Sequence, residues 1–289
     1  MTPAATRPTT RRSKPLRGYV EHGAIHLALI AYTLIALFPT LLVVMNSFKA
    51  RNSIFQSPYT WPTPSTFDAI GYTTVFTGSR FDLYFLNSLI VTLVSLLVIL
   101  SVSSMAAFAL SEYQFRGNPW LGLYLSIGIM VPIRLGTVSL LKLMVALKLA
   151  NTLPALILIY SAAGIPLAVF VLTQFFQTVP RELKDAARMD GASEYRVFGF
   201  CLPLVRPALG TVAIFNMIPI WNDLWFPLIV ASNERTKTVI LGAQQFLGQY
   251  LNDWNAVLAV LSLAALPAIA LYLVFSKQLI RGLTQGAVK

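Results

Sequence analysis

The sequence predicts an all-α integral membrane protein with about six transmembrane helices, and three observations support this. Of its 289 residues, 56% are hydrophobic and only 11% are charged, whereas a soluble domain usually carries about 25% charged residues. The apolar residues form long runs, and a helix needs about 20 of them to cross the hydrocarbon core of a bilayer. Most lysines and arginines stand in the connections between these runs, which is typical of membrane proteins.

Six apolar runs are candidate spans. Four contain no charged residue, namely 27–48, 84–111, 152–176 and 254–276. Two are interrupted, because 120–147 contains Arg134 and Lys142, and 207–232 contains Asp223. The first run exceeds the roughly 7–15 apolar residues of a cleaved signal peptide, so we expect it to be retained as a helix.

The remainder of the chain is organised around these spans. Residues 1–18 are rich in Thr, Pro, Arg and Lys, a composition that predicts a disordered basic cytoplasmic tail. Residues 19–289 are then one six-span membrane domain. Prolines fall within or beside several spans, Pro132 among them. Because proline lacks a backbone donor and kinks a helix, we expect a bundle of bent helices.

The basic residues also predict the orientation. With six spans, the side that holds both termini carries 14 of the lysines and arginines, and the opposite side carries 6. Cytoplasmic loops carry the excess of these residues, so both termini are expected in the cytoplasm. The net charge of +11 is therefore attributed to the membrane rather than to nucleic acid.

Several classes of site are excluded by residue counts. One cysteine and two histidines allow neither an intrachain disulfide nor a zinc site of these residues. No glycine is followed by lysine, so the phosphate-binding P-loop is absent. No set of nucleophile, base and metal ligands gathers at one membrane face. We expect no enzyme activity and no cofactor bound by this chain.

The connection 177–207 predicts a helix–turn–helix outside the membrane. Pro180 suits the start of a helix, and Gly191 suits the left-handed position that ends one. Pro203 ends the second helix. The turn is built from small residues flanked by two carboxylates, namely Ala186, Ala187, Gly191 and Ala192 with Asp185 and Asp190.

Two interpretations of this loop stay open on physical grounds. Its smooth tip suits docking in a groove of a partner protein. Alternatively, the loop is an amphipathic helix on the bilayer surface, with its cations facing lipid headgroups, namely Arg181, Lys184, Arg188 and Arg196.

The motif in this loop carries a family resemblance. It reads Asp185-Ala186-Ala187-x-x-Asp190-Gly191-Ala192, followed by Phe198, Leu202-Pro203 and Pro207. This motif resembles the EAA loop of permeases of ATP-driven (ABC) importers. Three further segments resemble the carbohydrate-uptake, MalG-like branch of that family, namely Asn87-Ser88, Trp221-Asn222-Asp223 and residues 277–282. The sequence departs from the family in having Asp185 where Glu is usual, and in a stretch from Gly191 to Pro203 that is one residue shorter.

The resemblance implies a permease subunit of a binding-protein-dependent sugar importer, which forms half of a translocation pathway in the inner or plasma membrane of a bacterium or archaeon. The implied partners are a second six-span permease, cytoplasmic subunits that bind and use ATP, and an extracytoplasmic sugar-binding protein. The loop would couple the permease to the ATPase through eight residues, namely Asp185, Ala186, Ala187, Asp190, Gly191, Ala192, Phe198 and Pro203.

Charged groups within spans are candidates for the substrate pathway, because burying them in lipid is costly. Arg134 lies two residues after Pro132 and can donate several hydrogen bonds to sugar hydroxyls. Asp223 lies beside Trp221 and Asn222, and an acid beside an indole suits a sugar. The alternative is structural: Arg134 or Lys142 pairs with Asp223 or reaches an interface, and the tryptophans form an aromatic belt.

Other functions remain as alternatives. An ion-coupled secondary transporter usually carries intramembrane acids for the coupling ion, and Asp223 is the one plausible acid here. A permease for a non-sugar solute, such as a polyol or a phosphodiester, is a second alternative, and a membrane scaffold is a third.

Overall fold

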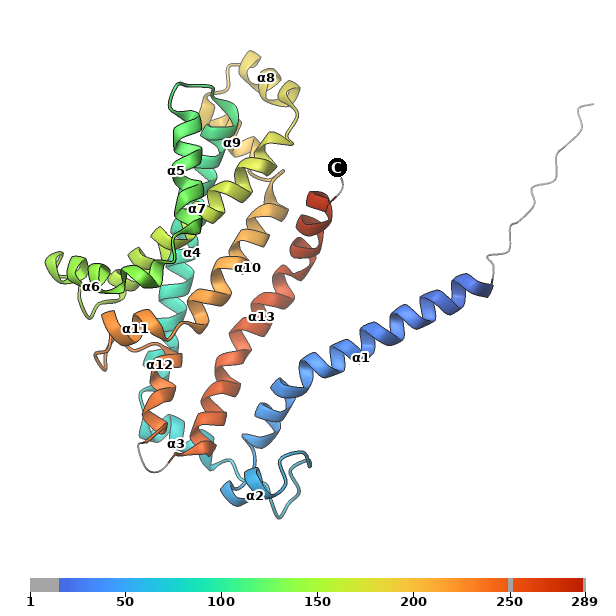
Figure 1. The fold of residues 1–289 in the computed structure, drawn as a ribbon, viewed down its shortest axis with the longest axis vertical. Coiled ribbons are helices and arrows are strands. Elements are labelled where there is room, and N and C mark those ends of the chain that lie inside the picture. Colours follow the sequence, from blue (N-terminus) through green and yellow to red (C-terminus); the bar gives the residue numbers. More distant parts are fainter. Residues whose placement is uncertain (1–15, 249–251, 288–289) are drawn as a thin grey trace, which may run out of the picture.

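The computed structural model describes residues 16–248 and 252–287, and this part of the chain is helical with no β-strand (Figure 1). Two short 3-10 helices accompany the α-helices, η1 (Ile133–Gly136) and η2 (Gln244–Phe246). The α-helices are α1 (Leu16–Asn46), α2 (Arg51–Gln56), α3 (Ile70–Gly78), α4 (Phe81–Glu112), α5 (Asn118–Met130), α6 (Thr137–Ala146), α7 (Leu153–Gln177), α8 (Arg181–Met189), α9 (Glu194–Cys201), α10 (Arg206–Asn222), α11 (Trp225–Val230), α12 (Val239–Ala243) and α13 (Trp254–Ala287).

The main core lies between α4, α7 and α10. These helices approach closely at Gly164 of α7, where an added Cβ would lie 2.4 Å from Oδ1 of Asn216 on α10 and 2.5 Å from Cδ1 of Ile99 on α4. Ile99 is fully buried, and α4 packs more extensively on α7 than on any other helix. A residue without a side chain at Gly164 therefore lets three helices meet.

A second core lies where α3, α12 and α13 meet the first turn of α4. Its buried residues include Val75, Tyr84 and Val260. Gly71 of α3 lies directly against the backbone of α13, because an added Cβ would lie 2.2 Å from the carbonyl oxygen of Asn255. This core is at the end of the molecule opposite α8 (Figure 1).

Two of the predicted spans are broken rather than straight. The predicted span 120–147 divides into α5 and η1–α6, which are bent by 83° to each other. Pro132 lies at the break, where it supplies no backbone donor. The predicted span 207–232 divides at Asp223 into α10 and the short helix α11. Here the Asp223 carboxylate accepts hydrogen bonds from the backbone nitrogens of Trp225 and Phe226, which starts α11.

The apolar helices confirm a multi-pass membrane protein, while the count of six spans stays a prediction. In the described part, three helices are long and apolar enough to cross a membrane alone, and two bent pairs raise the number to five. The apolar part of α13, Trp254–Ala270, falls short of that length.

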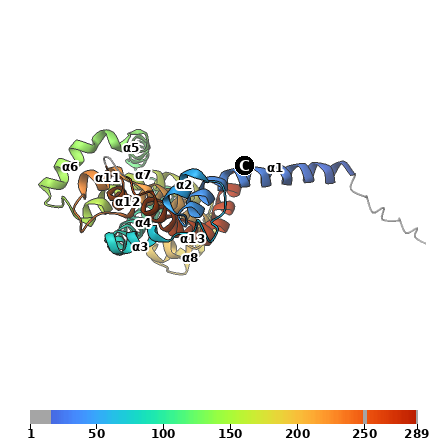
Figure 2. The ribbon, with the colours of Figure 1, turned by 90° about the horizontal axis from the view of Figure 1, so that it is seen from below.

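Helix α1 stands apart from the bundle (Figures 1 and 2). From Gly23 to Leu41 its side chains are exposed in this chain, and they are mainly apolar. The helix begins at Leu16, so residues 16–18 of the predicted disordered tail are helical. Residues 1–15 lie outside the described residues.

Candidate functional site

The predicted helix–turn–helix is a hairpin of α8 and α9 at one end of the molecule (Figure 1). Pro180 directly precedes α8, and α9 ends two residues before Pro203. Gly191 has a φ of +77°, which L-residues with a side chain adopt at a cost. The sequence-based prediction of a left-handed glycine at this turn is therefore confirmed.

The tip of the hairpin is accessible. Asp185, Ala186, Asp190 and Gly191 are exposed, and so is Pro203. No atom lies within 4 Å of a Cβ built at Gly191. A large apolar side chain also points outward, since Met189 is 87% exposed. The surface is thus free to meet another protein.

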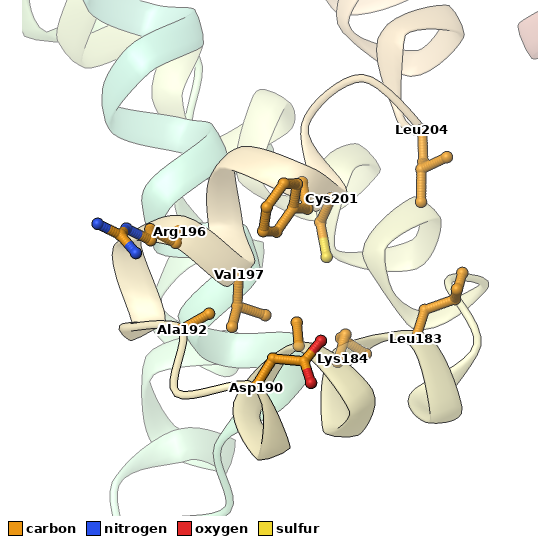
Figure 3. Close-up of a pocket in the computed structure, with 10 residues that line it drawn as sticks. Leu183, Lys184, Asp190, Ala192, Arg196, Val197, Cys201 and Leu204 are labelled. Atoms are coloured by element: carbon orange, nitrogen blue, oxygen red, sulfur yellow. The ribbon is translucent and has the colours of Figure 1, made fainter.

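A hollow of about 540 Å³ separates α8 from α9 (Figure 3). The half-buried residues Ala187 and Ala192 are among those that line it. Asp190 and Arg196 bring opposite charges to it (Figure 3). The exposed apolar side chains around it include Leu183, Phe200 and Leu204. It is therefore an apolar depression bordered by charge.

Phe198 packs against the bundle, unlike the exposed residues of the motif. Its ring lies 5.5 Å from that of Phe108 on α4 and 6.3 Å from that of Phe176 on α7, measured between centroids. We therefore interpret Phe198 as a support that fixes α9 on the bundle rather than as a surface contact.

A network of ion pairs braces the hairpin against the end of α4. Glu112 accepts hydrogen bonds from Lys184, which is only 5% exposed, and from Arg188, at 2.8 Å. Arg188 also pairs with Asp185 at 3.0 Å and with Glu194 at 2.9 Å. Lys184 and Arg188 are thus engaged within the protein, which counts against their predicted alternative role at lipid headgroups.

The same network perturbs the groups around it. Hydrogen bonds from Arg188 and from Tyr113 hold the pKa of Glu194 below its usual range. Burial, together with the bond to Glu194, raises the pKa of Tyr113 to about 12. Sequence reasoning missed Glu112 and Tyr113. The available signal was a lone carboxylate directly after the uncharged run 84–111, facing a loop rich in cations.

A second candidate site lies at the two helix breaks. Nη2 of Arg134 lies 3.4 Å from Oδ1 of Asp223, and the hydroxyl of Tyr160 on α7 donates to Oδ2 at 2.8 Å. Backbone nitrogens of Trp225 and Phe226 donate to the same carboxylate. Asp223 is buried with four donors, whereas the Arg134 side chain is 68% exposed. The pairing that the sequence left open is thus between Arg134 and Asp223.

These residues border a cavity of about 310 Å³ between η1, α7 and α10. Arg134, Tyr160, Asn216 and Asp223 supply its polar groups. Tyr160 and Asn216 were missed by sequence reasoning, because a polar residue in an otherwise apolar helix gives no sign of where it points. Lys142 is exposed on α6 and does not line this cavity.

The structure separates Trp221 and Asn222 from this site. The indole nitrogen of Trp221 donates to the carbonyl of Ala264 on α13 at 2.9 Å, and its ring is buried against Phe85. Asn222 is exposed and donates to the carbonyl of Ile218, one turn back on α10. Of the predicted pathway residues, Arg134 and Asp223 are together at the cavity.

Comparisons with known proteins identify the family of this chain. Residues 100–285 match the family model of the binding-protein-dependent transport system inner membrane component. The chain is 33% identical to the arabinooligosaccharides transport system permease protein AraQ of Halalkalibacterium halodurans, over 96% of this chain and 99% of that protein. It is 30% identical to the diacetylchitobiose uptake system permease protein NgcG of Streptomyces coelicolor, over 91% of this chain and 88% of that protein.

One solved structure is similar in fold. It is a chain of a bacterial ABC transporter involved in the import of the acidic polysaccharide alginate, with a TM-score of 0.76 and 21% sequence identity. The match covers 94% of this chain and 99% of that one.

Proposed function

Because this chain belongs to the family of binding-protein-dependent transport system inner membrane components, we propose that it is the permease subunit of an ATP-driven sugar importer. The saccharide transport named in the relatives AraQ and NgcG supports the sugar class. The chain forms half of the translocation pathway. A second permease, cytoplasmic ATPase subunits and an extracytoplasmic sugar-binding protein complete the importer. The chain itself binds no cofactor, and ATP is used by the partner.

The observation that carries this proposal is the exposed tip of the α8–α9 hairpin. Its turn is formed by a left-handed glycine with open space around it, and its base is braced on the bundle by a buried ion pair. A surface that is both rigid and smooth suits close docking to another protein. We therefore assign the ATPase contact to the outward-facing residues of the hairpin, namely Asp185, Ala186, Asp190, Gly191 and Pro203, with Ala187 and Ala192 shaping the hollow beside them.

The substrate pathway passes the cavity at the helix breaks. Asp223 already accepts four hydrogen bonds, so it holds Arg134 rather than meeting the sugar. The exposed guanidinium has further N–H donors, and these suit sugar hydroxyl or carboxylate oxygens. Asp223 and Tyr160 are thus positioning residues for Arg134.

The substitution Gly191→Leu tests the docking surface. A side chain at a φ of +77° costs roughly 1–2 kcal/mol of backbone strain, and its atoms would separate the docked surfaces. We expect normal amounts of the permease in the membrane, with ATPase binding and sugar uptake lost together. The measurement is co-purification of the ATPase subunit, combined with uptake of a panel of labelled mono- and oligosaccharides.

The variant Gly191→Asn is the matched control. Asparagine tolerates the left-handed conformation, so this variant adds atoms to the surface with little strain. Weakened ATPase binding in both variants would assign the effect to the contact surface. Full ATPase binding and uptake in Gly191→Leu would refute docking at this turn.

A further inference from the structure

Each end of helix α4 is bonded to another part of the chain, by hydrogen bonds at one end and by ion pairs at the other. At the end away from the hairpin, the Asn87 side chain donates to the backbone carbonyls of Arg235 and Lys237, each at 3.0 Å. The Ser88 hydroxyl accepts from the backbone nitrogen of Val239 at 2.8 Å. Both side chains are buried. The connection between α11 and α12 is thus fixed by one turn of α4, which the proposed topology places at the outer face.

Tyr84 of α4 also contacts this part of the chain, through its ring and its hydroxyl. A Cβ at Gly242 of α12 would lie 2.3 Å from Cδ2 of this ring, so only glycine allows α12 to pack this closely. The Tyr84 hydroxyl also donates to the Glu234 carboxylate. Residues 233–243, which comprise the end of this connection and α12 and are called the outer connection below, are therefore held on α4 both by hydrogen bonds and by packing.

At its other end, α4 finishes on Glu112, which pairs with Lys184 and Arg188 of the hairpin. The whole of α4 has 32 residues and contains neither proline nor glycine, which gives a length of about 48 Å at 1.5 Å per residue. The other helices of more than 15 residues in the described part each contain an internal proline, namely Pro39, Pro166, Pro219 and Pro267. Helix α4 is thus the uninterrupted connection between the two ends.

We propose that α4 is the coupling strut of this permease, which transmits movement of the outer connection 233–243 to the ATPase-coupling hairpin through Asn87 and Ser88 at one end and Glu112 at the other. A straight helix transmits displacement along its axis, whereas a proline-kinked one can bend instead. Rigid elements with specific contacts at both ends are able to carry coupling between distant sites. The inference rests on the proposed function for what docks at each end.

Hydrogen exchange in the full chain, reconstituted in nanodiscs, tests this directly and needs neither ATPase nor sugar. Because coupling is reciprocal, Asn87→Ala and Ser88→Ala should speed amide exchange in residues 181–201, and Glu112→Gln should speed it in 233–243. We expect changes of about fivefold or more, the lower end of typical coupling. Glu112→Asp, which keeps the charge, replaces Glu112→Gln if the latter does not accumulate.

Two further variants sharpen the test. Ser101→Ala removes an exposed hydroxyl from the middle of α4 and should change neither end. Leu97→Gly loosens the helix at an exposed position and, combined with Ser88→Ala, should abolish the remote effect while the local one remains. Changes confined to the substituted end in every variant would overturn the strut. Failure of the wild-type chain to bind an ATPase would instead refute the proposed function and leave the exchange result standing.

Discussion

At the scale of single residues, the site is organised by carboxylates that each serve several donors. Glu112 holds two cations of the hairpin, and Asp223 accepts from an arginine, a tyrosine and two backbone nitrogens. The sequence predicted that Asp223 mattered, because an acid within a span is costly. It could not predict that Asp223 starts α11, since that depends on where the chain turns after Asn222. Function at these positions therefore depends on geometry that residue type alone does not specify.

The two members of the Arg134–Asp223 pair should contribute unequally to stability. Asp223→Asn removes a buried charge and leaves donors of Tyr160 and the backbone poorly matched, which costs about 1–3 kcal/mol for an unsatisfied buried group. Arg134→Ala removes a largely exposed side chain, and such ion pairs contribute roughly 0–1 kcal/mol. Thermal unfolding of the two variants in detergent should therefore show the larger loss for Asp223→Asn. In the uptake assay, by contrast, Arg134→Ala should have a clear effect. It should raise the sugar concentration needed for the half-maximal rate while the importer still assembles. Equal stability losses would contradict this division of roles.

At the scale of helices, apolar runs predicted where the elements are, and side-chain contacts decided where they break. The uncharged run 84–111 lies within α4, which begins three residues before it and ends one residue after it. The runs 120–147 and 207–232 were predicted as single spans and are broken. Pro132 explains the first break from sequence alone, whereas the second needs the carboxylate of Asp223 to bond back onto the chain. Hydropathy measures transfer to lipid and is insensitive to such local bonds.

The contact between α3 and α13 gives an element-scale prediction. Gly71→Ala would place a methyl group 2.2 Å from the carbonyl oxygen of Asn255, and backbone cannot shift as a flexible side chain can. Overpacking of this kind costs about 1–3 kcal/mol, so the apparent Tm should fall. Gly122→Ala is the control, because nothing lies within 4 Å of a Cβ there and alanine favours a helix by up to about 1 kcal/mol. A Tm for Gly71→Ala at or above that of Gly122→Ala would show that α3 is not packed as described.

At the scale of the whole molecule, the predicted membrane orientation assigns the two ends of the bundle to opposite sides of the membrane. The hairpin and the C-terminal end of α13 lie toward one end, and α2 and α3 lie at the other (Figure 1). The hairpin end holds the basic residues of the connection 177–207, while the cations of residues 1–15 lie outside the described residues. In the described residues, helix length alone gives three candidate spans, the two bent pairs raise the number to five, and the apolar part of α13 is too short to add a sixth. Alternation of charge between connections does not depend on helix length, and on that basis six spans stay the prediction.

This orientation can be tested by labelling single cysteines in intact cells. Cys201 is buried and is the one cysteine in the chain, so Cys201→Ala gives a background without thiols. Ser65 and Ser193 are both exposed, one in the connection between α2 and α3 and the other in the hairpin. With both termini in the cytoplasm, a membrane-impermeant maleimide should label Ser65→Cys from outside. It should label Ser193→Cys only after the cells are opened. Labelling of both from outside, or the reverse order, would contradict the topology, because three predicted spans separate these two connections and place them on opposite sides.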